Sequence, residues 1–432
     1  MKYALFLLLY NLFYPIFLLL SLPGFFIKMK RRGGSVSDVW ERLGIYRIPR
    51  SAEPQGVVYV HAVSVGEVFI ALKWIRCWQA THREPVVLAT STATGLQMVR
   101  KAAIPGVRAL YSPVDLPCVV RGCMRRFTPS VVVLIEAELW PNQARICRKL
   151  GIPMVMLNAR LSPRSERRYA KVRSITGRLF SHLSALGAQN ERDEARFAGI
   201  GVPPDIITVT GSIKFDVLGD APETKREDFQ EILQSLSEGR PVILASSTHA
   251  GEEVLIARAI RAVGGFPLIV PRHMERRADV VRDLQSAGFS PLLRTETEGK
   301  PLPAPNASTC YVADTTGELR EWTALADVVV IGKSFLAQGG QNPVEAIAAH
   351  VPVVVGPDMT NFADLVRLLC EEKGIYPCSA DTLESTLRSI LENPQETSAH
   401  TQRAYAALHI HAGATQRSVR LVEETRAKAT GA

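Results

Sequence analysis

The chain has 432 residues, of which 47% are hydrophobic and 22% are charged, which is enough for two α/β domains with additional segments. Its seven cysteines show no paired Cys-x-x-Cys spacing, which argues against a disulfide framework or a zinc site and predicts reduced, buried thiols in the cytoplasm. The net charge of +9 indicates an anionic partner: nucleic acid, an anionic membrane or a phosphorylated substrate. Nucleic acid is disfavoured, because aromatic residues do not interleave with the basic clusters and no nucleic-acid-binding signature is present.

The N-terminal segment favours the membrane. Residues 4–27 are almost wholly apolar and long enough to cross a bilayer core. The basic residues that follow, Lys28, Lys30, Arg31 and Arg32, predict that the bulk of the protein stays in the cytoplasm. A cleaved signal peptide is the alternative, but an Ala-x-Ala site is lacking. Pro15 and Pro23 leave open a helix that lies in the membrane interface, so we predict an anchor over residues 1–32 without fixing its orientation.

Beyond the anchor, short apolar runs alternate with helical patterns, which predicts parallel sheets with crossover helices. The strands expected in the first half are 57–60, 86–89, 131–135, 154–157 and 185–188; those in the second half are 242–245, 268–270, 311–313, 328–331 and 353–355. A polar, acidic stretch over 211–239 suits a junction. We therefore predict an α/β fold of two Rossmann-like domains, 33–215 and 216–432, that face a cleft with binding sites at the strand ends. Neither a Gly-x-Gly-x-x-Gly fingerprint nor a P-loop is present, so a nicotinamide dehydrogenase or P-loop kinase is not supported.

Glu67 is the first candidate site residue. It follows the strand 57–60 at the start of a helical pattern that runs from Val68 to Trp78. Ligands bind at the carboxyl ends of strands in open α/β sheets, so a carboxylate there can act on a substrate. By position alone, however, a residue that only complements the helix dipole is the favoured interpretation, because carboxylates are common at such turns.

Two further groups in the first half suggest chemistry. Glu136 and Glu138 follow a buried strand, and neighbouring carboxylates raise one another's pKa toward that of a base near neutrality; a solvated turn before a helix starting near Pro141 is the alternative. From Arg160 to Arg178 the chain carries seven basic residues and one acid, Glu166. A solvated face normally mixes charges, so this run indicates contact with phosphate or anionic headgroups.

In the second half, polar residues again follow the expected strands. The turn 246–253 can hold a phosphate on helix amides, and 271–273 follows the next strand. Thr315 and Glu318 have capping-box spacing. The motif 339–345 predicts a helix start with Asn342 as its cap, Pro343 in its first position and Glu345 in its third. Its glycine pair permits close approach by a ligand, and a carboxylate there can hold a ribose diol; capping and binding are compatible.

Several motifs run in order over most of the chain: His-Ala-Val-Ser-Val-Gly-Glu (61–67), Glu-Ala-Glu-Leu-Trp-Pro-Asn (136–142), Asn-Ala-Arg-Leu-Ser (158–162), Gly-Ser-Ile-Lys-Phe-Asp (211–216), Ser-Thr-His-Ala-Gly-Glu (247–252), Pro-Arg-His (271–273), Asp-Thr-Thr-Gly-Glu-Leu (314–319), Gly-Gly-Gln-Asn-Pro-Val-Glu (339–345) and Asn-Phe (361–362). In these the chain resembles the bacterial Kdo transferases, which add 3-deoxy-D-manno-oct-2-ulosonic acid (Kdo) to the lipid A precursor. One departure is Lys333, where the family pattern leads us to expect a second small residue.

The resemblance implies an inverting, metal-independent glycosyltransferase of the GT-B type that uses CMP-Kdo as substrate, needs no cofactor and acts at the cytoplasmic face of the inner membrane in lipopolysaccharide synthesis. It implies that Glu67 is the general base, and that Ser64, Gly66, Glu136, Glu138, Arg160 and Arg164 meet the phosphorylated lipid A precursor. The residues implied to hold the donor are Ser247, Thr248, His249, Arg272, His273, Gly340, Gln341, Asn342 and Glu345.

Two alternatives remain at this stage. Another enzyme of the same fold, such as a UDP-sugar transferase or a nucleotide-sugar epimerase, is compatible with the architecture. A non-catalytic, anchored lipid-binding module would bind lipid and tolerate the loss of Glu67.

Overall fold

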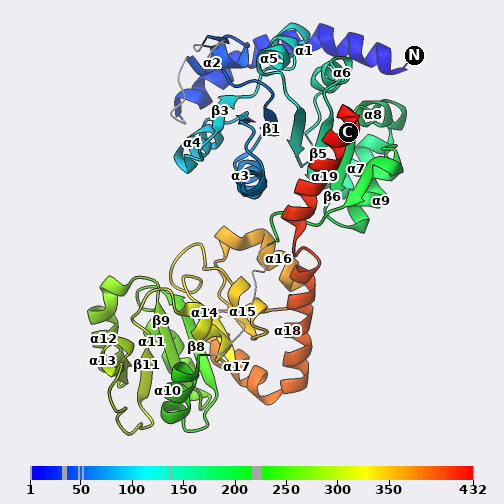
Figure 1. The fold of residues 1–432 in the computed structure, drawn as a ribbon. Coiled ribbons are helices and arrows are strands. Elements are labelled where there is room, and N and C mark those ends of the chain that lie inside the picture. The colour runs from blue at the N-terminus through cyan, green and yellow to red at the C-terminus, as the bar shows by residue number, and fades with distance from the viewer. Residues whose placement is uncertain are drawn as a thin grey trace. The chain divides into compact units, whose positions relative to one another are not determined.

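The computed structural model describes residues 2–31, 37–46, 49–50, 53–136, 138–216 and 226–431, with the side chains of 22–31, 37–39 and 430 excepted. It divides into two compact units, Met1–Asp216 with Gly413–Ala432, and Val217–Ala412 (Figure 1). The predicted second domain was therefore wrong at its C-terminal end. The last helix, α19 (Ala414–Thr430), returns to the first unit because Val419 and Val422 are buried in that unit's core. The cleft predicted between the domains stays a prediction.

The first unit is built around a parallel seven-stranded sheet in the order β3-β2-β1-β4-β5-β6-β7. Its strands are β1 (Val58–Ala62), β2 (Val86–Thr90), β3 (Val107–Tyr111), β4 (Val131–Ile135), β5 (Met154–Ala159), β6 (Ala185–Ala188) and β7 (Ile207–Val209). Its helices are α1 (Lys2–Arg31), α2 (Ser37–Arg42), α3 (Val65–Thr81), α4 (Ala93–Ala102), α5 (Pro117–Phe127), α6 (Pro141–Lys149), α7 (Pro163–Ala170), α8 (Arg173–Phe180), α9 (Glu191–Gly199) and α19, with a 3-10 turn η2 (Pro204–Ile206).

The second unit repeats this plan in the order β10-β11-β9-β8-β12-β13-β14, and its paired strands are all parallel. The strands are β8 (Val242–Thr248), β9 (Phe266–Pro271), β10 (Ser290–Leu293), β11 (Thr309–Val312), β12 (Val328–Ile331), β13 (Val353–Val355) and β14 (Tyr376–Pro377). The helices are α10 (Glu227–Ser237), α11 (Glu252–Ala262), α12 (Arg277–Ser286), α13 (Arg294–Thr297), α14 (Leu319–Ala324), α15 (Val344–Ala348), α16 (Ala363–Glu371), α17 (Leu383–Glu392) and α18 (Pro394–His409), with 3-10 turns η3 (Met274–Arg276), η4 (Thr360–Phe362) and η5 (Ala380–Thr382). The predicted pair of Rossmann-like domains is confirmed.

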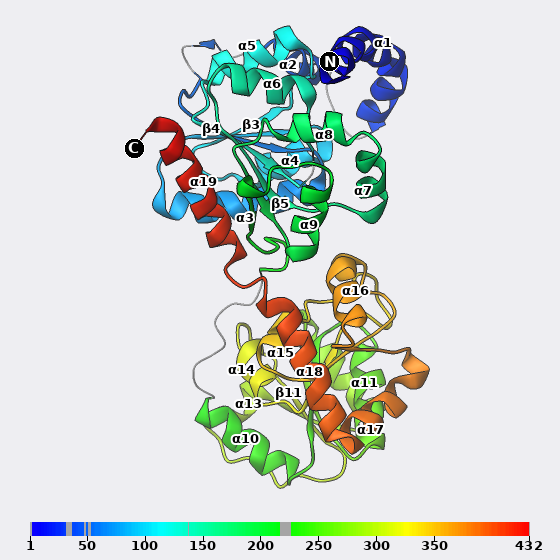
Figure 2. The same ribbon diagram turned by 90° about the vertical axis from the view of Figure 1, so that its right-hand side faces the viewer.

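Alternating side chains bury both faces of the first sheet. Tyr59 of β1 belongs to one core cluster, with residues of α5 and α6, whereas Val58 and Val60 belong to the other, with residues of α3 and α19. Figures 1 and 2 show these helix pairs on opposite sides of the sheet. A parallel sheet covered on both faces needs apolar strands, which is why its central strands are visible in the sequence as continuous apolar runs.

The strand orders place two switch points. In the first sheet β1 lies between β2 and β4, and in the second sheet β8 lies between β9 and β12. The crossovers leave on opposite sides at these places, so the turns after the strands diverge and leave a crevice for ligand in folds of this kind. The turns after β1 and β8 carry Glu67 and Glu252, respectively.

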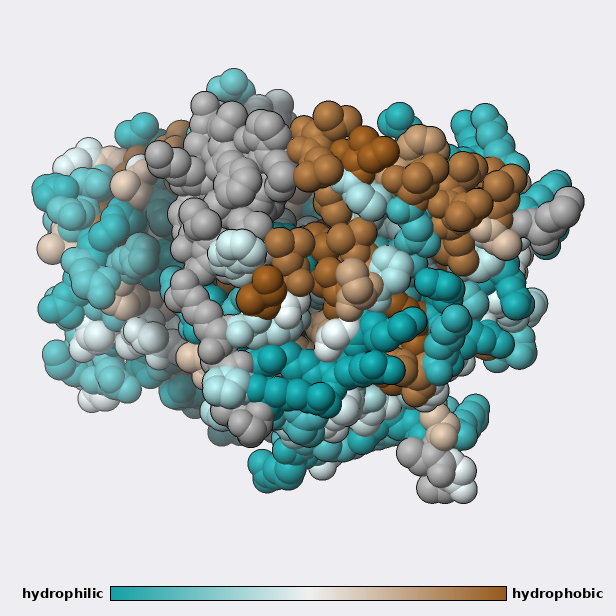
Figure 3. Space-filling model, turned by 90° about the horizontal axis from the view of Figure 1, so that it is seen from above, coloured by the Kyte–Doolittle hydropathy of each residue, from teal (hydrophilic) through white to brown (hydrophobic). Residues whose placement is uncertain are grey.

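Helix α1 is continuous from Lys2 to Arg31, so Pro15 and Pro23 do not end it. It is the one helix in the described part of the chain that is long and apolar enough to cross a membrane. Its exposed apolar side chains contribute to the hydrophobic surface in Figure 3: Leu5, Leu8, Leu9, Leu12, Phe13, Ile16, Phe17, Leu19 and Leu20. The free thiols are less uniform than predicted, since Cys118 is exposed while Cys123, Cys147 and Cys310 are buried.

Candidate active site

The turn after β1 holds Glu67 in a buried position. Ser64 is the N-cap of α3, and its hydroxyl accepts a hydrogen bond from the Glu67 N–H at 3.2 Å. The Glu67 carboxylate reaches back and accepts a bond from the Val63 N–H at 2.7 Å. Only 7% of Glu67 is exposed, although Ser64 and Gly66 beside it are exposed. Glu67 thus lies in the first turn of α3, where a carboxylate complements the helix dipole as foreseen, and its carboxylate is beside an open turn.

Burial raises the pKa of Glu67 from its ordinary 4.5 to about 7, against the opposing effect of the bonds from Val63 and Ser64. Repulsion from Glu136 and Glu138 adds a smaller increase in the same direction. A carboxylate with a pKa near 7 is half deprotonated at neutral pH and basic enough to take a proton from a hydroxyl during attack. Among the carboxylates predicted for this site, Glu67 is thus the one suited to general-base catalysis.

Glu136 and Glu138 reach this region from the neighbouring strand. β4 pairs with β1 in parallel, so Glu136 follows its strand at the same edge of the sheet. Its backbone is left-handed, with φ of 62°, and its N–H donates to Leu157 O at 2.9 Å. Burial raises the pKa of Glu138, although much of its side chain is exposed. The two carboxylates therefore act on the pKa of Glu67, and a base among the two themselves stays a prediction.

The basic run lies on exposed surface of the first unit. Arg160 follows β5, and Arg164, Arg167, Arg168 and Lys171 line an open depression of about 520 Å³ on α7. The run's single acid, Glu166, pairs with Arg196 at 3.3 Å. None of the seven basic residues between 160 and 178 lies within 4.0 Å of a carboxylate in the described part of the chain: Arg160, Arg164, Arg167, Arg168, Lys171, Arg173 and Arg178.

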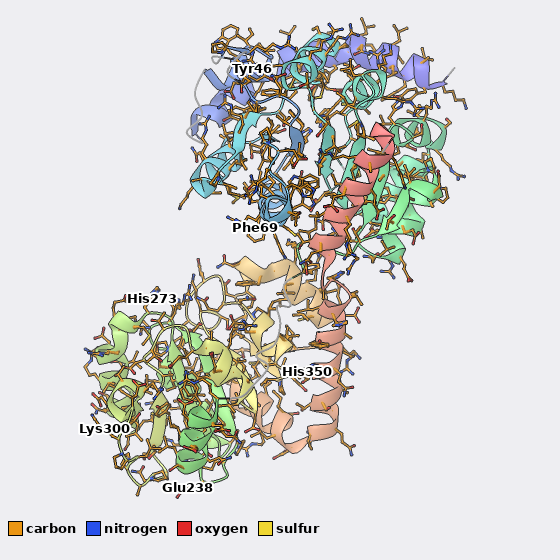
Figure 4. The ribbon with its side chains drawn as sticks, viewed as in Figure 1. Tyr46, Phe69, Glu238, His273, Lys300 and His350 are labelled. Carbon is orange, nitrogen blue, oxygen red and sulfur yellow. The ribbon has the colours of Figure 1, made fainter. Side chains whose placement is uncertain are left out.

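The second unit brings the predicted donor residues to one sheet edge. Ser247 and Thr248 are buried at the end of β8, and Ser247 has a φ of 54°. The N–H of Arg272 donates to Thr248 O at 3.0 Å, which fixes the end of β9 beside them. The rings of His249 and His273 lie edge to face, 5.6 Å apart. Arg272 and His273 are exposed, and Figure 4 shows His273 at the rim of this unit.

Glu252 has a structural role that the sequence analysis did not foresee. It is fully buried, and its carboxylate accepts backbone N–H bonds from His249 at 3.0 Å, Lys333 at 2.6 Å, Phe335 at 3.0 Å and Leu336 at 3.2 Å. The turn after β12 is thereby fixed to the turn after β8. Lys333 has a φ of 58°, a backbone shape that favours glycine, which gives a physical reason for expecting a small residue there.

The motif 339–345 differs from its prediction at the start of its helix, and its two glycines are closely packed. A Cβ on Gly339 would meet Asn361 Nδ2 at 2.4 Å, and one on Gly340 would meet Met359 Sδ at 2.3 Å, so both positions need glycine; the approach of a ligand to this pair stays a prediction. Their φ values of 109° and 69° also require glycine. Helix α15 begins at Val344 with Pro343 as its N-cap, so Asn342 lies outside the helix and accepts from the Val344 N–H at 3.2 Å.

Gln341 and Asn342 nevertheless remain on the surface of this edge, and Glu345 is half-buried behind them. Burial raises the pKa of Glu345, and its Oε2 has no hydrogen-bond partner among the described residues. The predicted capping box at Thr315 and Glu318 is wrong. The Thr315 hydroxyl does bond to Glu318, but helix α14 starts only after that residue.

The sequence analysis also missed side chains near Glu67. His61 on β1 is 5% exposed, and its Nδ1 lies 3.3 Å from Gln143 Oε1. Burial lowers its pKa to about 4, so the ring is neutral at pH 7. Phe69 is 58% exposed and leaves α3 on the side away from the sheet (Figure 4). An isolated histidine or phenylalanine carries no sequence signal, so only the fold identifies them.

Two doubly wound parallel sheets, with a buried carboxylate of raised pKa at the first switch point, define an α/β enzyme of the class that handles nucleotides and sugars. Residues 37–217 match the family model described as 3-deoxy-D-manno-octulosonic-acid transferase (kdotransferase). The chain is 32% identical over 392 residues to the 3-deoxy-D-manno-octulosonic acid transferase of Haemophilus influenzae, covering 89% of this chain and 90% of that one. It is 32% identical over 421 residues to that of Bordetella pertussis, covering 93% and 96%. The chain belongs to the 3-deoxy-D-manno-octulosonic acid transferase family.

Among solved structures, the chain is similar to the C-terminal CMP-Kdo binding domain of WaaA from Acinetobacter baumannii. The identity is 30% and the TM-score is 0.37, with 42% of this chain and 93% of that domain covered.

Proposed function

We propose that this chain transfers Kdo from CMP-Kdo to the phosphorylated lipid A precursor, with inversion at the anomeric carbon. The observation that carries the proposal is Glu67, whose carboxylate has a pKa of about 7 at the switch point of the first sheet in a chain of this family. At neutral pH such a group alternates between accepting and releasing a proton, as a general base must do in each turnover.

The first unit would hold the acceptor. Glu67 takes the proton of an acceptor sugar hydroxyl while that oxygen forms a bond to the anomeric carbon of Kdo. The bond between this carbon and the phosphate oxygen breaks on the opposite face, and CMP leaves with the electron pair. The transition state is oxocarbenium-like, as in glycosyl transfer generally. Deprotonated Glu67 returns when the proton passes to water.

The second unit would hold CMP-Kdo. The exposed side chains of Arg272 and His273, beside the buried end of β8, offer cationic and hydrogen-bonding groups to the CMP phosphate as its charge grows. Glu345, with an unpartnered oxygen, suits a hydroxyl donor such as the cytidine ribose. CMP leaves the anomeric carbon of Kdo as a phosphate monoester, and such groups would stabilise its charge without a metal or other cofactor.

The proposed location at a membrane follows from the lipid nature of the acceptor. Helix α1 exposes an apolar face, and the uncompensated arginines of α7 suit an anionic surface or the acceptor phosphates. We place the enzyme at the cytoplasmic face of the inner membrane, where the basic residues at the C-terminal end of α1, Lys28, Lys30 and Arg31, would stay in the cytoplasm. Replacing Arg164 and Arg167 together by glutamine should raise KM for the lipid about three- to tenfold and leave KM for CMP-Kdo unchanged, since arginine–phosphate bonds are charge-assisted.

The test is to incubate the full-length protein with CMP-Kdo and a lipid A precursor and to weigh the product by mass spectrometry. The expected result is a lipid heavier by one or more Kdo residues, formed by the wild type and not by Glu67→Gln. A UDP-sugar enzyme would instead bind UDP in preference to CMP and give no such product. A lipid-binding module would bind the precursor equally well with or without Glu67 and form no product with any donor.

A further inference from the structure

One face of α1 is bonded to the first unit, and the opposite face is exposed. Tyr3, Tyr10 and Tyr14 are seven and four residues apart and therefore lie in one row along the helix, with Asn11 next to them. The Tyr3 hydroxyl lies 3.2 Å from His182 Nε2, and the Tyr10 ring stacks on that of Tyr14 at 5.0 Å. The exposed leucines of α1 lie on the other face, at Leu5, Leu8, Leu9, Leu12, Leu19 and Leu20. The helix is thus attached by a polar row and free on its apolar side.

Asp115 stands at the centre of this attachment. It is 3% exposed and lies just before α5. Its Oδ2 accepts from the Tyr10 hydroxyl at 3.0 Å, and its own N–H donates to the Tyr14 hydroxyl at 3.4 Å. The same carboxylate accepts the N–H groups of Asn142 and Gln143, each at 2.9 Å.

The second pair of bonds makes Asp115 the N-terminal cap of α6. That helix begins at Pro141, and its own N-cap, Trp140, has no side-chain capping bond. The first amides of a helix need acceptors, and here a carboxylate from another segment supplies them. Because α6 directly follows the stretch that carries Glu136 and Glu138, Asp115 determines where this stretch ends.

Helix α1 contacts the same stretch directly. Asn142 is fully buried, and its Nδ2 donates to Asn11 Oδ1 at 2.8 Å and to Asp115 O at 2.6 Å. The rings of Tyr14 and Trp140 lie 6.3 Å apart. The bonds continue inward through Gln143 to His61 on β1, the strand that leads to Glu67. Contacts therefore run from α1 to both strand ends that hold the carboxylates of the site.

We propose that Asp115 is a positioning residue that fixes the acceptor-side segment 136–142 to helix α1, so that seating of α1 in a membrane sets the affinity for the lipid acceptor. This inference rests on the proposed function. A helix bonded to the folded unit from Tyr3 to Asn11 and Tyr14 lies along one leaflet with its apolar face inserted, because spanning the bilayer would require those bonds to break.

The experiment removes only the bonds on the helix side. Tyr10→Phe combined with Asn11→Leu keeps α1 apolar and leaves Asp115 as the cap of α6. Tyr3→Phe is the matched control, because it removes one hydroxyl bond of the same helix, to His182, that involves neither Asp115 nor Asn142. Steady-state kinetics use CMP-Kdo and lipid A precursor in vesicles of phosphatidylethanolamine and phosphatidylglycerol.

For the double variant we expect KM for the precursor to rise about three- to tenfold, as two lost hydrogen bonds allow, with kcat and KM for CMP-Kdo within about twofold of wild type. The control should remain within about twofold in all three constants. An equal rise in KM for Tyr3→Phe, or no rise in the double variant, would overturn the proposal. A loss of kcat without a change of KM would also overturn it, since that indicates general damage to the fold.

A second measurement separates this inference from the proposed function. Hydrogen exchange of the amides over 138–143 is recorded for full-length protein, free and bound to the same vesicles without substrate. Wild type should gain protection on binding, and the double variant should bind the vesicles without that gain. If wild type makes no Kdo-bearing lipid but shows the gain, the proposed function fails and the positioning role stands. If neither protein gains protection, the positioning role fails whatever the activity.

Discussion

Glu67 and Glu252 occupy equivalent places in the two units, in the first turn of the helix that follows the strand at the switch point, and both are buried. Their surroundings differ. Glu252 accepts four backbone N–H bonds and joins two turns. Glu67 accepts one backbone N–H bond, from Val63, interacts with the Ser64 side chain, and has Glu136 and Glu138 in its vicinity. A buried carboxylate that accepts many hydrogen bonds serves the structure. A buried carboxylate that accepts few has a raised pKa and can act as a base.

The largest expected effect comes from removing the carboxylate of Glu67. Glu67→Gln keeps the shape and the acceptor for the Val63 N–H, but it removes the group that takes the proton. Turnover should fall by about 10²–10⁴-fold, with CMP affinity nearly unchanged. Rapid-quench or steady-state assays on the purified variant, with calorimetry of CMP binding, measure both. Near-normal turnover would show that Glu67 is only a helix cap.

The same experiment at Glu252 should affect stability first. Glu252→Ala leaves four partly buried amides without their acceptor, at His249, Lys333, Phe335 and Leu336. Because an unsatisfied buried donor costs about 1–3 kcal/mol and partial burial lowers that cost, we expect a loss of about 3 kcal/mol in the second unit, seen as a lower urea midpoint. Glu252→Gln, which keeps one acceptor oxygen, should lose less. Wild-type stability in the alanine variant would contradict the structural role.

The raised pKa of Glu67 also predicts how stability responds to removing its charge. The pKa of Glu67 is 4.5 when unfolded and about 7 when folded, so its contribution to stability is complete below pH 4.5 and is lost as the pH rises through 7. The difference corresponds to ~3 kcal/mol at most. Glu67→Gln should therefore stabilise the protein at pH 8 and not at pH 4. Denaturant titrations at both pH values test this, and a destabilised Glu67→Gln at pH 8 would refute the pKa assigned to Glu67.

The strands show how far sequence patterns reach. All ten predicted strands exist, and the four that were missed, β3, β7, β10 and β14, are the edges of the two sheets. Interior strands are buried on both faces and must be apolar, so they are recognisable; β7 and β14 are short and largely exposed, so nothing in their composition marks them. The returning helix α19 was missed for a related reason, since a helical pattern does not say which core buries it.

Site residues that follow strand ends could be predicted from the sequence, whereas roles that depend on contacts between distant segments could not. Glu67 and the turn residues of β8 and β9 follow strand ends, which the sequence indicates. The structural role of Glu252 depends on amides some eighty residues away, and the capping of α6 by Asp115 joins segments far apart in the chain. Gly339 and Gly340 fit a ligand-binding turn by composition, but they are also required because Asn361 and Met359 occupy the space of a Cβ, which no local pattern indicates.

The smallest expected effect concerns Glu345, a third carboxylate at a helix start. It accepts too few bonds to be structural, because its Oε2 has no partner among the described residues, and α15 has no side-chain cap that its loss would remove. Burial raises its pKa, and Glu321 nearby adds repulsion. If Glu345 holds a ribose hydroxyl, Glu345→Ala should weaken CMP binding by ~0.5–1.5 kcal/mol, or about two- to tenfold, with no loss of stability.

Glu321→Ala is the matched control for that variant. It removes a neighbouring carboxylate of the same charge, and Glu321 also has an unpartnered buried oxygen. If charge alone mattered, both variants would bind the anionic nucleotide more tightly; if Glu345 is a ligand, only its loss weakens binding. Isothermal calorimetry with CMP on both folded variants decides the matter. Equal CMP affinities of the two variants would leave Glu345 as a buried acid without a role in the donor site. Glu67 would then be the carboxylate in the described chain whose few hydrogen bonds and raised pKa suit it to catalysis.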